Sequence, residues 1–149
     1  MTKVLMVCLG NICRSPLAEG ILQFKVDASK VQVDSAGMDG YHKGELPDKR
    51  SIKVASENLI DITDQRARVF KLSDFDVYDI IYAMDKHVFN KIKNIAPNDA
   101  ASKKVKLLLN EVFPGENLDV PDPYHDSIYA FRNVYKMIDE ACDVIVSNL

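Results

Sequence analysis

The most constraining feature of the 149-residue chain is an apolar run that ends at Cys8, with five residues between this cysteine and Arg14. In this run, from Val4 to Val7, polar and apolar residues do not alternate as they do in a strand with one solvent-exposed face. It therefore suits a strand buried on both faces of a parallel sheet. Pro16 stands where the first turn of a helix would lie. Apolar residues then continue at helical spacing, at Leu17, Ala18, Ile21, Leu22 and Phe24, so the pattern predicts a strand, a tight loop and a helix.

The loop between Cys8 and Arg14 has the composition of an anion-binding nest. Gly10 tolerates positive φ, and Asn11 is one of the few other residues that visit the left-handed region. We therefore expect a tight turn whose backbone N–H groups converge, with the N-terminus of the helix pointing at the same place. The other residues of the predicted phosphate-binding loop are Leu9, Ile12, Cys13 and Ser15.

A cysteine in such a nest is suited to attack on phosphorus. The converging N–H groups, the helix N-terminus and the guanidinium of Arg14 favour a thiolate at Cys8, and Ser15 can donate its hydroxyl to the sulfur. The planar fork of Arg14 can hold two oxygens of a phosphoryl group at once. The loop thus provides a nucleophile and stabilises charge on the equatorial oxygens. The simpler alternative, a small buried hydrophobe, stays open for Cys13.

Length and charge narrow the class of protein. The chain is predicted to form one domain, residues 1–149, and its net charge of −3 with no lysine or arginine run argues against nucleic acid as a partner. The apolar run is too short for a signal sequence or a membrane span, so we expect a cytoplasmic protein with no membrane partner. Three cysteines fit a reducing compartment. We expect no metal and no other cofactor, because no ligand spacing occurs among the cysteines and His42, His87 and His125.

The rest of the chain alternates between strand and helix patterns. Strands are predicted at residues 31–35, 77–84 and 105–109, and helices at 47–59, 86–95 and 128–145. The alternation predicts an α/β fold, a three-layer arrangement in which a parallel, twisted sheet of four strands carries helices on both faces. Leu59 is expected on the buried face of its helix, Cys142 in the core, and Arg68 on a solvated basic face.

Two carboxylates stand at places that suit a functional site. Asp85 follows the third predicted strand, at the edge where open α/β sheets place their ligands, and it equally suits the N-cap of the next helix. Pro121 and Pro123 restrict the backbone around Asp122, which would hold its carboxylate in a fixed orientation. A turn-forming Asp-Pro is the simpler alternative. Attack on a phosphate ester needs an acid to protonate the leaving oxygen, and we predict that Asp122 supplies it.

The segment at residues 8–16 resembles the signature loop of the low-molecular-weight protein tyrosine phosphatases. Further motifs follow in the order and approximate spacing of that family, so the resemblance covers essentially the whole chain. They are Asp34-Ser35-Ala36-Gly37, Phe75, Tyr78-Asp79-Ile80, Met84-Asp85 and Asp122-Pro123-Tyr124. The resemblance implies a flavodoxin-like phosphatase fold and metal-independent hydrolysis of phosphotyrosine, and of small aryl phosphates, through a phosphocysteine. Phosphotyrosine-bearing proteins or peptides would be the substrates and inorganic phosphate a product.

The resemblance also implies roles that the pattern alone leaves open. It places Tyr41 and Tyr124 on the substrate crevice, and it places Asp85 beside the signature loop as a support. It further implies that Cys8 and Cys13 can form a reversible disulfide under peroxide. The chain departs from the family at Gln65, where some members have a loop-supporting histidine, and at His125, where many have a second aromatic residue.

Other functions remain open. The protein arginine phosphatases of the same superfamily resemble these enzymes but carry threonine where this chain has Ile12, and an apolar residue there favours an aromatic substrate, as do Tyr41 and Tyr124. Arsenate reduction on this fold needs further cysteines, of which only Cys142 stands late in the chain. A phospho-ligand binding module, or a phosphocysteine carrier of a sugar-transport system, has no use for an aimed acid such as Asp122.

Overall fold

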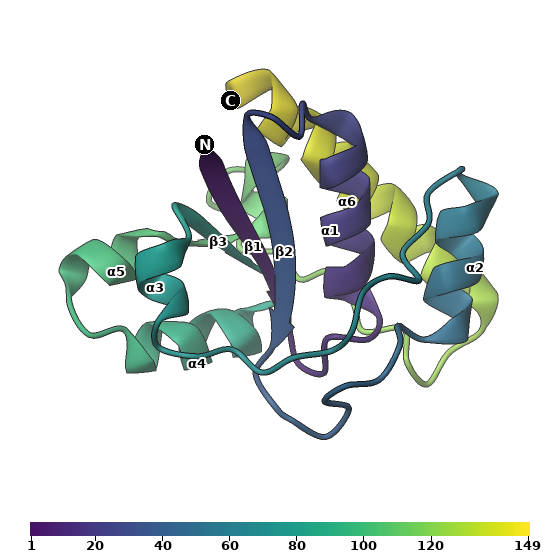
Figure 1. Ribbon diagram of the computed structural model, residues 1–149, viewed down its shortest axis with the longest axis horizontal. Helices are drawn as coiled ribbons and strands as arrows, with labels where there is room; N and C mark the ends of the chain where they lie inside the picture. The colour runs from purple at the N-terminus through teal and green to yellow at the C-terminus, as the bar shows by residue number, and fades with distance from the viewer.

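A sheet of four parallel strands forms the centre of the computed structural model, which describes residues 1–149 (Figure 1). The strands lie in the order β2-β1-β3-β4, and every neighbouring pair is parallel. Their bounds are β1 (Thr2–Cys8), β2 (Val31–Gly37), β3 (Ile80–Ala83) and β4 (Val105–Leu107). The predicted α/β class with a four-stranded parallel sheet is confirmed.

Helices cover both faces of the sheet (Figure 1). One face carries α1 (Arg14–Lys25), α2 (Lys49–Glu57) and α6 (Ile128–Asn148), and the other carries α3 (Asp74–Val77), α4 (Lys86–Ile95) and α5 (Asp99–Lys103). A short 3₁₀ helix, η1 (Leu108–Glu111), follows β4. No helix combines the length and the apolar character needed to cross a membrane.

The central position of β1 explains its unbroken apolar sequence. Val4 and Met6 pack into the cluster under α1, α2 and α6, whereas Leu5 and Val7 pack into the cluster on the opposite face, and all four are fully buried. Successive side chains of a strand point to opposite faces, so a strand covered on both sides needs apolar residues at every position.

Two strands are shorter than their sequence pattern predicts. The segment before β3 turns into α3, which leaves Val77 exposed, so the strand begins at Ile80 rather than Val77. At the other edge, β4 pairs only with the three residues from Ile81 to Ala83 and then turns into η1. An apolar run does not by itself show where a strand begins and ends: Val77 lies in a helix and is exposed, whereas Leu108 and Leu109 are buried in a helical turn.

The predicted buried face of α2 is wrong at Leu59. The helix ends at Glu57, and Leu59 lies beyond the end in the left-handed region with a φ of 64° and is 87 % exposed. The buried side chains of α2 are instead Ser51, Val54 and Ala55. Phe24 likewise follows the helical spacing of α1 but is 66 % exposed, because it lies at the last turn of the helix.

Candidate active site

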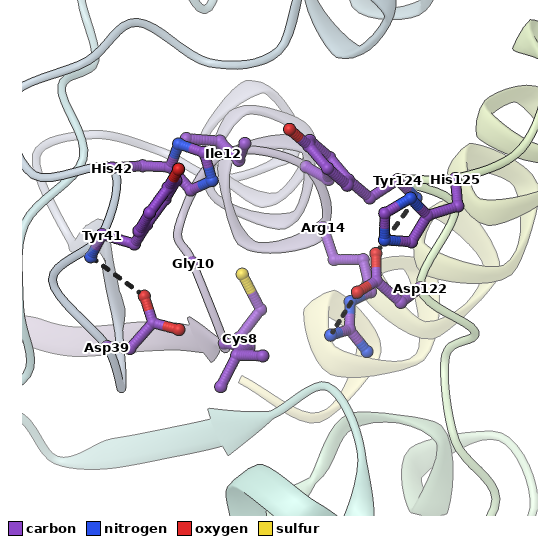
Figure 2. Close-up of a pocket in the computed structure, with 12 residues that line it drawn as sticks. Cys8, Gly10, Ile12, Arg14, Asp39, Tyr41, His42, Asp122, Tyr124 and His125 are labelled. Carbon is purple, nitrogen blue, oxygen red and sulfur yellow. Dashed lines mark hydrogen bonds and ion pairs between the residues drawn. The ribbon is translucent and has the colours of Figure 1, made fainter.

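A cavity of about 200 Å³ lies at the carboxyl end of β1, where the strand order reverses between β1 and β3. Ligands of open α/β sheets bind at this kind of switch point. The lining residues are Cys8, Leu9, Gly10, Ile12, Cys13, Arg14, Asp39, Tyr41, His42, Asp122, Tyr124 and His125. Figure 2 shows the Cys8 sulfur pointing into the space between Asp39 and Tyr41 on one side and Asp122 and Tyr124 on the other.

The loop between β1 and α1 is turned by Asn11. Its φ is 57°, whereas Gly10, which would also tolerate the left-handed region, does not take a positive φ. Gly10 serves by its small size instead, because a Cβ at that position would lie 3.2 Å from Cδ2 of His42. The turn brings the backbone N–H of Asn11 to 3.2 Å from the Cys8 sulfur, and Ser15 Oγ lies 2.9 Å from the same atom.

The Asn11 side chain is buried and bonded at both ends. Its Nδ2 donates to Ser15 Oγ at 2.8 Å and to Ser35 Oγ at 2.9 Å, and its Oδ1 accepts from the backbone N–H of Arg68 at 3.0 Å. Because Ser15 Oγ accepts from Asn11, its own hydrogen is free to point at the Cys8 sulfur. Asn11 therefore connects Cys8 and Ser15 to β2 and to the loop that carries Arg68.

Glu19 closes this network on the side away from the cavity. Ser35 Oγ donates to Glu19 Oε1 at 2.8 Å. Burial raises the pKa of Glu19 to about 7; the Ser35 hydroxyl opposes the shift and the nearby carboxylates of Asp34 and Asp64 add to it. A carboxyl group whose pKa is raised to about 7 thus lies three hydrogen bonds from Ser15, through Asn11 and Ser35.

Gln65 supports the start of α1 by a backbone contact. Its Nε2 donates to the carbonyl oxygen of Pro16 at 3.1 Å, while its Oε1 is buried without a hydrogen-bond partner. The expected solvated face is wrong for Arg68, whose guanidinium forms two bonds to Asp74, at 3.0 and 3.1 Å. Asp74 is 1 % exposed, and a buried carboxylate needs such a partner.

Arg14 is held from two sides. Its Nη1 donates to Asp85 Oδ2 at 2.7 Å and to the carbonyl oxygen of Val120 at 2.8 Å, and the side chain is only 3 % exposed. Burial opposes the charge, but Cys8, Asp85 and Asp122 together outweigh it and raise the pKa of the guanidinium. Arg14 thus carries a permanent positive charge at the cavity.

Asp85 makes both of the contacts that the sequence allowed. One oxygen bonds to Arg14, and the other accepts from the backbone N–H of Val88 at 2.8 Å as the N-cap of α4. The carboxylate therefore orients the guanidinium and caps a helix at the same time.

Asp122 lies at the mouth of the cavity, on the Arg14 side (Figure 2). Its Oδ2 is 3.9 Å from Nη2 of Arg14, and its Oδ1 accepts from the backbone N–H of Tyr124 at 3.1 Å. The side chain is 49 % exposed, so a substrate and a water molecule can both reach it.

The rim of the cavity is aromatic. Tyr41 is 85 % and Tyr124 is 38 % exposed, and the His42 ring lies between them, with centroid distances of 4.8 and 6.0 Å. His125 packs edge-on against Tyr124 at 5.0 Å. Asp39 and His42 also line the cavity but were not predicted as site residues; their closeness to Tyr41 in one loop is the signal that could have identified them.

Cys13 lines the cavity but is 5 % exposed. Burial, with smaller contributions from Asp48 and Cys8, raises the pKa of its thiol far above the ordinary value, so Cys13 is protonated. All three cysteines are free thiols, and Cys142 is buried on α6. The reversible disulfide between Cys8 and Cys13 stays a prediction. No cluster of three potential metal-ligating side chains is present.

Known proteins match the chain over nearly its whole length. The family described as "Low molecular weight phosphotyrosine protein phosphatase" matches residues 3–149. A low molecular weight protein-tyrosine-phosphatase of Streptomyces coelicolor is 35 % identical, over 93 % of this chain and 88 % of its own length. The crystal structure of a protein tyrosine phosphatase from Entamoeba histolytica superimposes with a TM-score of 0.92, at 31 % identity, and covers 99 % of this chain and 96 % of that one.

A second similar structure is that of Vibrio vulnificus Wzb in complex with benzylphosphonate. It superimposes with a TM-score of 0.89 at 33 % identity, and the match covers 99 % of each chain.

Proposed function

Because the chain belongs to the low molecular weight phosphotyrosine protein phosphatase family and is therefore a protein tyrosine phosphatase, we propose that it works through a phosphocysteine on Cys8. The observation that carries this proposal is the convergence on one cavity of Cys8 and Arg14, which share a loop, and Asp122, which comes from a distant part of the chain. Arg14 is the phosphate ligand, and Asp122 is the acid and then the base.

In the first step Cys8 attacks phosphorus in line with the leaving oxygen. The Ser15 hydroxyl and the backbone N–H of Asn11, both within 3.2 Å of the sulfur, stabilise the thiolate. Arg14 and the backbone N–H groups of the loop hold the equatorial phosphoryl oxygens as charge develops. A sulfur–phosphorus bond forms as the oxygen–phosphorus bond of the ester breaks.

Asp122 transfers a proton in both steps. Its carboxyl group protonates the oxygen that leaves as the tyrosine hydroxyl, and the resulting carboxylate then accepts a proton from the water that attacks the phosphocysteine. The sulfur–phosphorus bond breaks, inorganic phosphate is released, and Cys8 and Asp122 return to their starting states. No step requires a metal.

The cavity walls favour an aromatic substrate. Tyr41, Tyr124 and Ile12 provide apolar surface on which a phenyl ring can pack. The Vibrio protein was solved with benzylphosphonate, and we propose the same class of ligand here: phosphotyrosine in a protein or peptide. A cytoplasmic location, with no nucleic acid or membrane as partner, belongs to the same proposal, because a reducing compartment keeps Cys8 a free thiol.

The Cys8→Ser variant tests the mechanism. We expect it to release no phosphate from phosphotyrosine peptides in the presence of a metal chelator, and yet to bind inorganic phosphate nearly as well as the native protein, because the loop and Arg14 are unchanged. Parallel assays with phosphoserine and phosphoarginine peptides measure specificity.

A Cys142→Ala variant is the matched control, since it removes a cysteine that does not line the cavity, and its activity should stay close to native. Turnover retained in Cys8→Ser would overturn the phosphocysteine proposal, and release from phosphoarginine alone would overturn the phosphotyrosine specificity.

A further inference from the structure

Arg50 lies in the first turn of α2, outside the cavity, and makes an unusual number of directed bonds. Its Nε and Nη2 donate to the two oxygens of Asp48 at 3.0 Å each. Its Nη2 also donates to the carbonyl oxygen of Tyr124 at 2.9 Å, and its Nη1 donates to the carbonyl oxygen of Asp126 at 2.8 Å. Four of its five N–H groups thus have fixed partners.

The two carbonyl groups belong to the segment that carries Asp122. This segment, residues 121–127, contains no helix or strand. Before Asp122 it is attached at Val120, whose N–H donates to Met84 and whose oxygen accepts from Arg14. After Asp122, the bonds from Arg50 are the only hydrogen bonds that join residues 123–126 to another part of the fold, and Ser127 then accepts from the backbone N–H of Ala130 as α6 begins.

The other end of the Arg50 contact reaches the nucleophile loop. The side chain of Asp48 accepts from Arg50, and its backbone N–H donates to the carbonyl oxygen of Ile12 at 2.8 Å. Ser51 Oγ donates to the carbonyl oxygen of Cys13 at 3.1 Å. The start of α2 therefore bonds to the phosphate-binding loop through its backbone and Ser51, and to the Asp122 segment through Arg50.

We propose that Arg50 is a positioning residue that sets the place of Asp122 relative to Cys8. The inference rests on the proposed role of Asp122 as the general acid. Arg50 is not one of the residues that line the cavity. It acts by holding the carbonyl groups of Tyr124 and Asp126 against α2, so that the Asp122 carboxyl meets the leaving oxygen.

The geometry requires arginine. The guanidinium lies over the buried Phe131 ring, with Cζ 4.3 Å from the centroid, while its edge makes the four hydrogen bonds. A planar fork can stack on a ring and donate in several fixed directions at once, whereas a lysine ammonium is a point charge on a flexible stem. Lysine at this position is expected to keep the charge but not the two carbonyl contacts together.

The test compares substrates that differ in their need for an acid. The Arg50→Gln variant should lose about 10- to 100-fold in kcat/KM for phenyl phosphate, whose leaving group needs a proton, because a displacement of about 1 Å can cost that much. With p-nitrophenyl phosphate, whose phenolate leaves more easily, the loss should be under about threefold. Binding of inorganic phosphate should stay native, since Arg14 and its partners are untouched.

Arg132→Gln is the matched control. Arg132 also makes a two-bond contact between α6 and α2, to Glu57 at 3.0 and 2.7 Å, but it touches neither the Asp122 segment nor the cavity. The change in kcat/KM that Arg132→Gln causes should be the same for phenyl phosphate and for p-nitrophenyl phosphate. Arg50→Lys should recover only part of the loss on phenyl phosphate.

Asp122→Asn separates the two ways in which the experiment can fail. If Asp122→Asn shows the substrate-dependent loss and Arg50→Gln lowers both substrates equally, or lowers neither, the role of Arg50 is overturned and the proposed function stands. If Asp122→Asn itself shows no substrate dependence, the acid assignment falls and the role of Arg50 falls with it. In a variant that combines Arg50→Gln with Asp122→Asn, the Arg50 substitution should not further increase the loss on phenyl phosphate relative to p-nitrophenyl phosphate, because the acid is already absent.

Discussion

Asn11 combines two properties that no other residue type offers at its position. A glycine would take the φ of 57° at less cost, but it would lack the side chain that bonds to Ser15, Ser35 and the backbone of Arg68. The sequence indicated that Asn11 tolerates a left-handed turn. It gave no sign that the amide would be buried and bonded to three segments, because two of those partners lie 24 and 57 positions away.

Glu19 should make stability depend on pH. Folding raises its pKa from an ordinary value near 4.5 to about 7, chiefly through burial. Between these values the native state holds more protons than the unfolded state, so the free energy of unfolding falls as pH rises through this window. Between pH 5 and pH 8, the free energy of unfolding of the native protein should fall by on the order of 2 kcal/mol more than that of the Glu19→Gln variant.

Chemical denaturation of both proteins at the two pH values measures this difference. Glutamine keeps an oxygen that can accept from Ser35, so the comparison isolates the charge. Equal pH dependence in the two proteins would show that Glu19 ionises in the folded state as easily as in the unfolded state.

At the scale of the element, α2 ends in a Schellman motif. The N–H of Ile60 donates to the oxygen of Ala55, and the N–H of Leu59 donates to the oxygen of Ser56, both at 3.0 Å. This motif needs a left-handed residue at Leu59, a position usually filled by glycine. Leucine is strained there, and its side chain is 87 % exposed, so little burial offsets the strain.

Replacing Leu59 with glycine should therefore stabilise the protein. We expect Leu59→Gly to raise the free energy of unfolding by roughly 0.5 to 1 kcal/mol, the relief of left-handed strain less the greater entropy of an unfolded glycine. Leu59→Ala is the control, because it shortens the side chain but keeps the Cβ that causes the strain, and it should bring no gain. Equal stabilities of the glycine and alanine variants would argue against a strained helix end.

At the scale of the whole molecule, a chain with a net charge of −3 has to bind a phosphate anion. The positive potential is therefore local: it comes from Arg14, the N-terminus of α1 and the backbone N–H groups of one loop. The parallel sheet brings these groups together, because β1 and β3 are parallel neighbours and their carboxyl ends place Cys8 and Asp85 at the same edge. Arg14 bonds to the carbonyl oxygen of Val120, so the segment that follows Val120 starts at this edge too.

Inorganic phosphate should stabilise the folded protein through this site. At about 100 times its dissociation constant, a ligand that binds only the native state adds about 2.7 kcal/mol, which corresponds to roughly 5 to 10 °C in Tm for a chain of this size. A thermal scan with increasing phosphate measures the shift.

Arg14→Lys should lose most of this shift, since lysine keeps the charge but not the fork, whereas Arg132→Gln should keep it. A shift of the same size in Arg14→Lys would place the phosphate site elsewhere on the protein.

The sequence by itself determined the parts of this protein that are local. The strand at β1, the loop, the start of α1 and the cap of α4 by Asp85 follow from residues within a few positions of one another, and periodicity predicts such elements. Cys8 and Arg14 share a loop for the same reason. The α/β class followed from the alternation of strand and helix patterns along the chain.

Only the tertiary structure decided how distant segments meet. Asp85 lies 71 positions from Arg14, and the oxygens that Arg50 holds lie 74 and 76 positions from it. Chain periodicity reports which residues are buried, but it does not report which polar groups bond across the fold. The shortened strands, the exposed Leu59 and the role of Arg50 all depend on where the backbone turns, and that is set by the packing of the whole molecule.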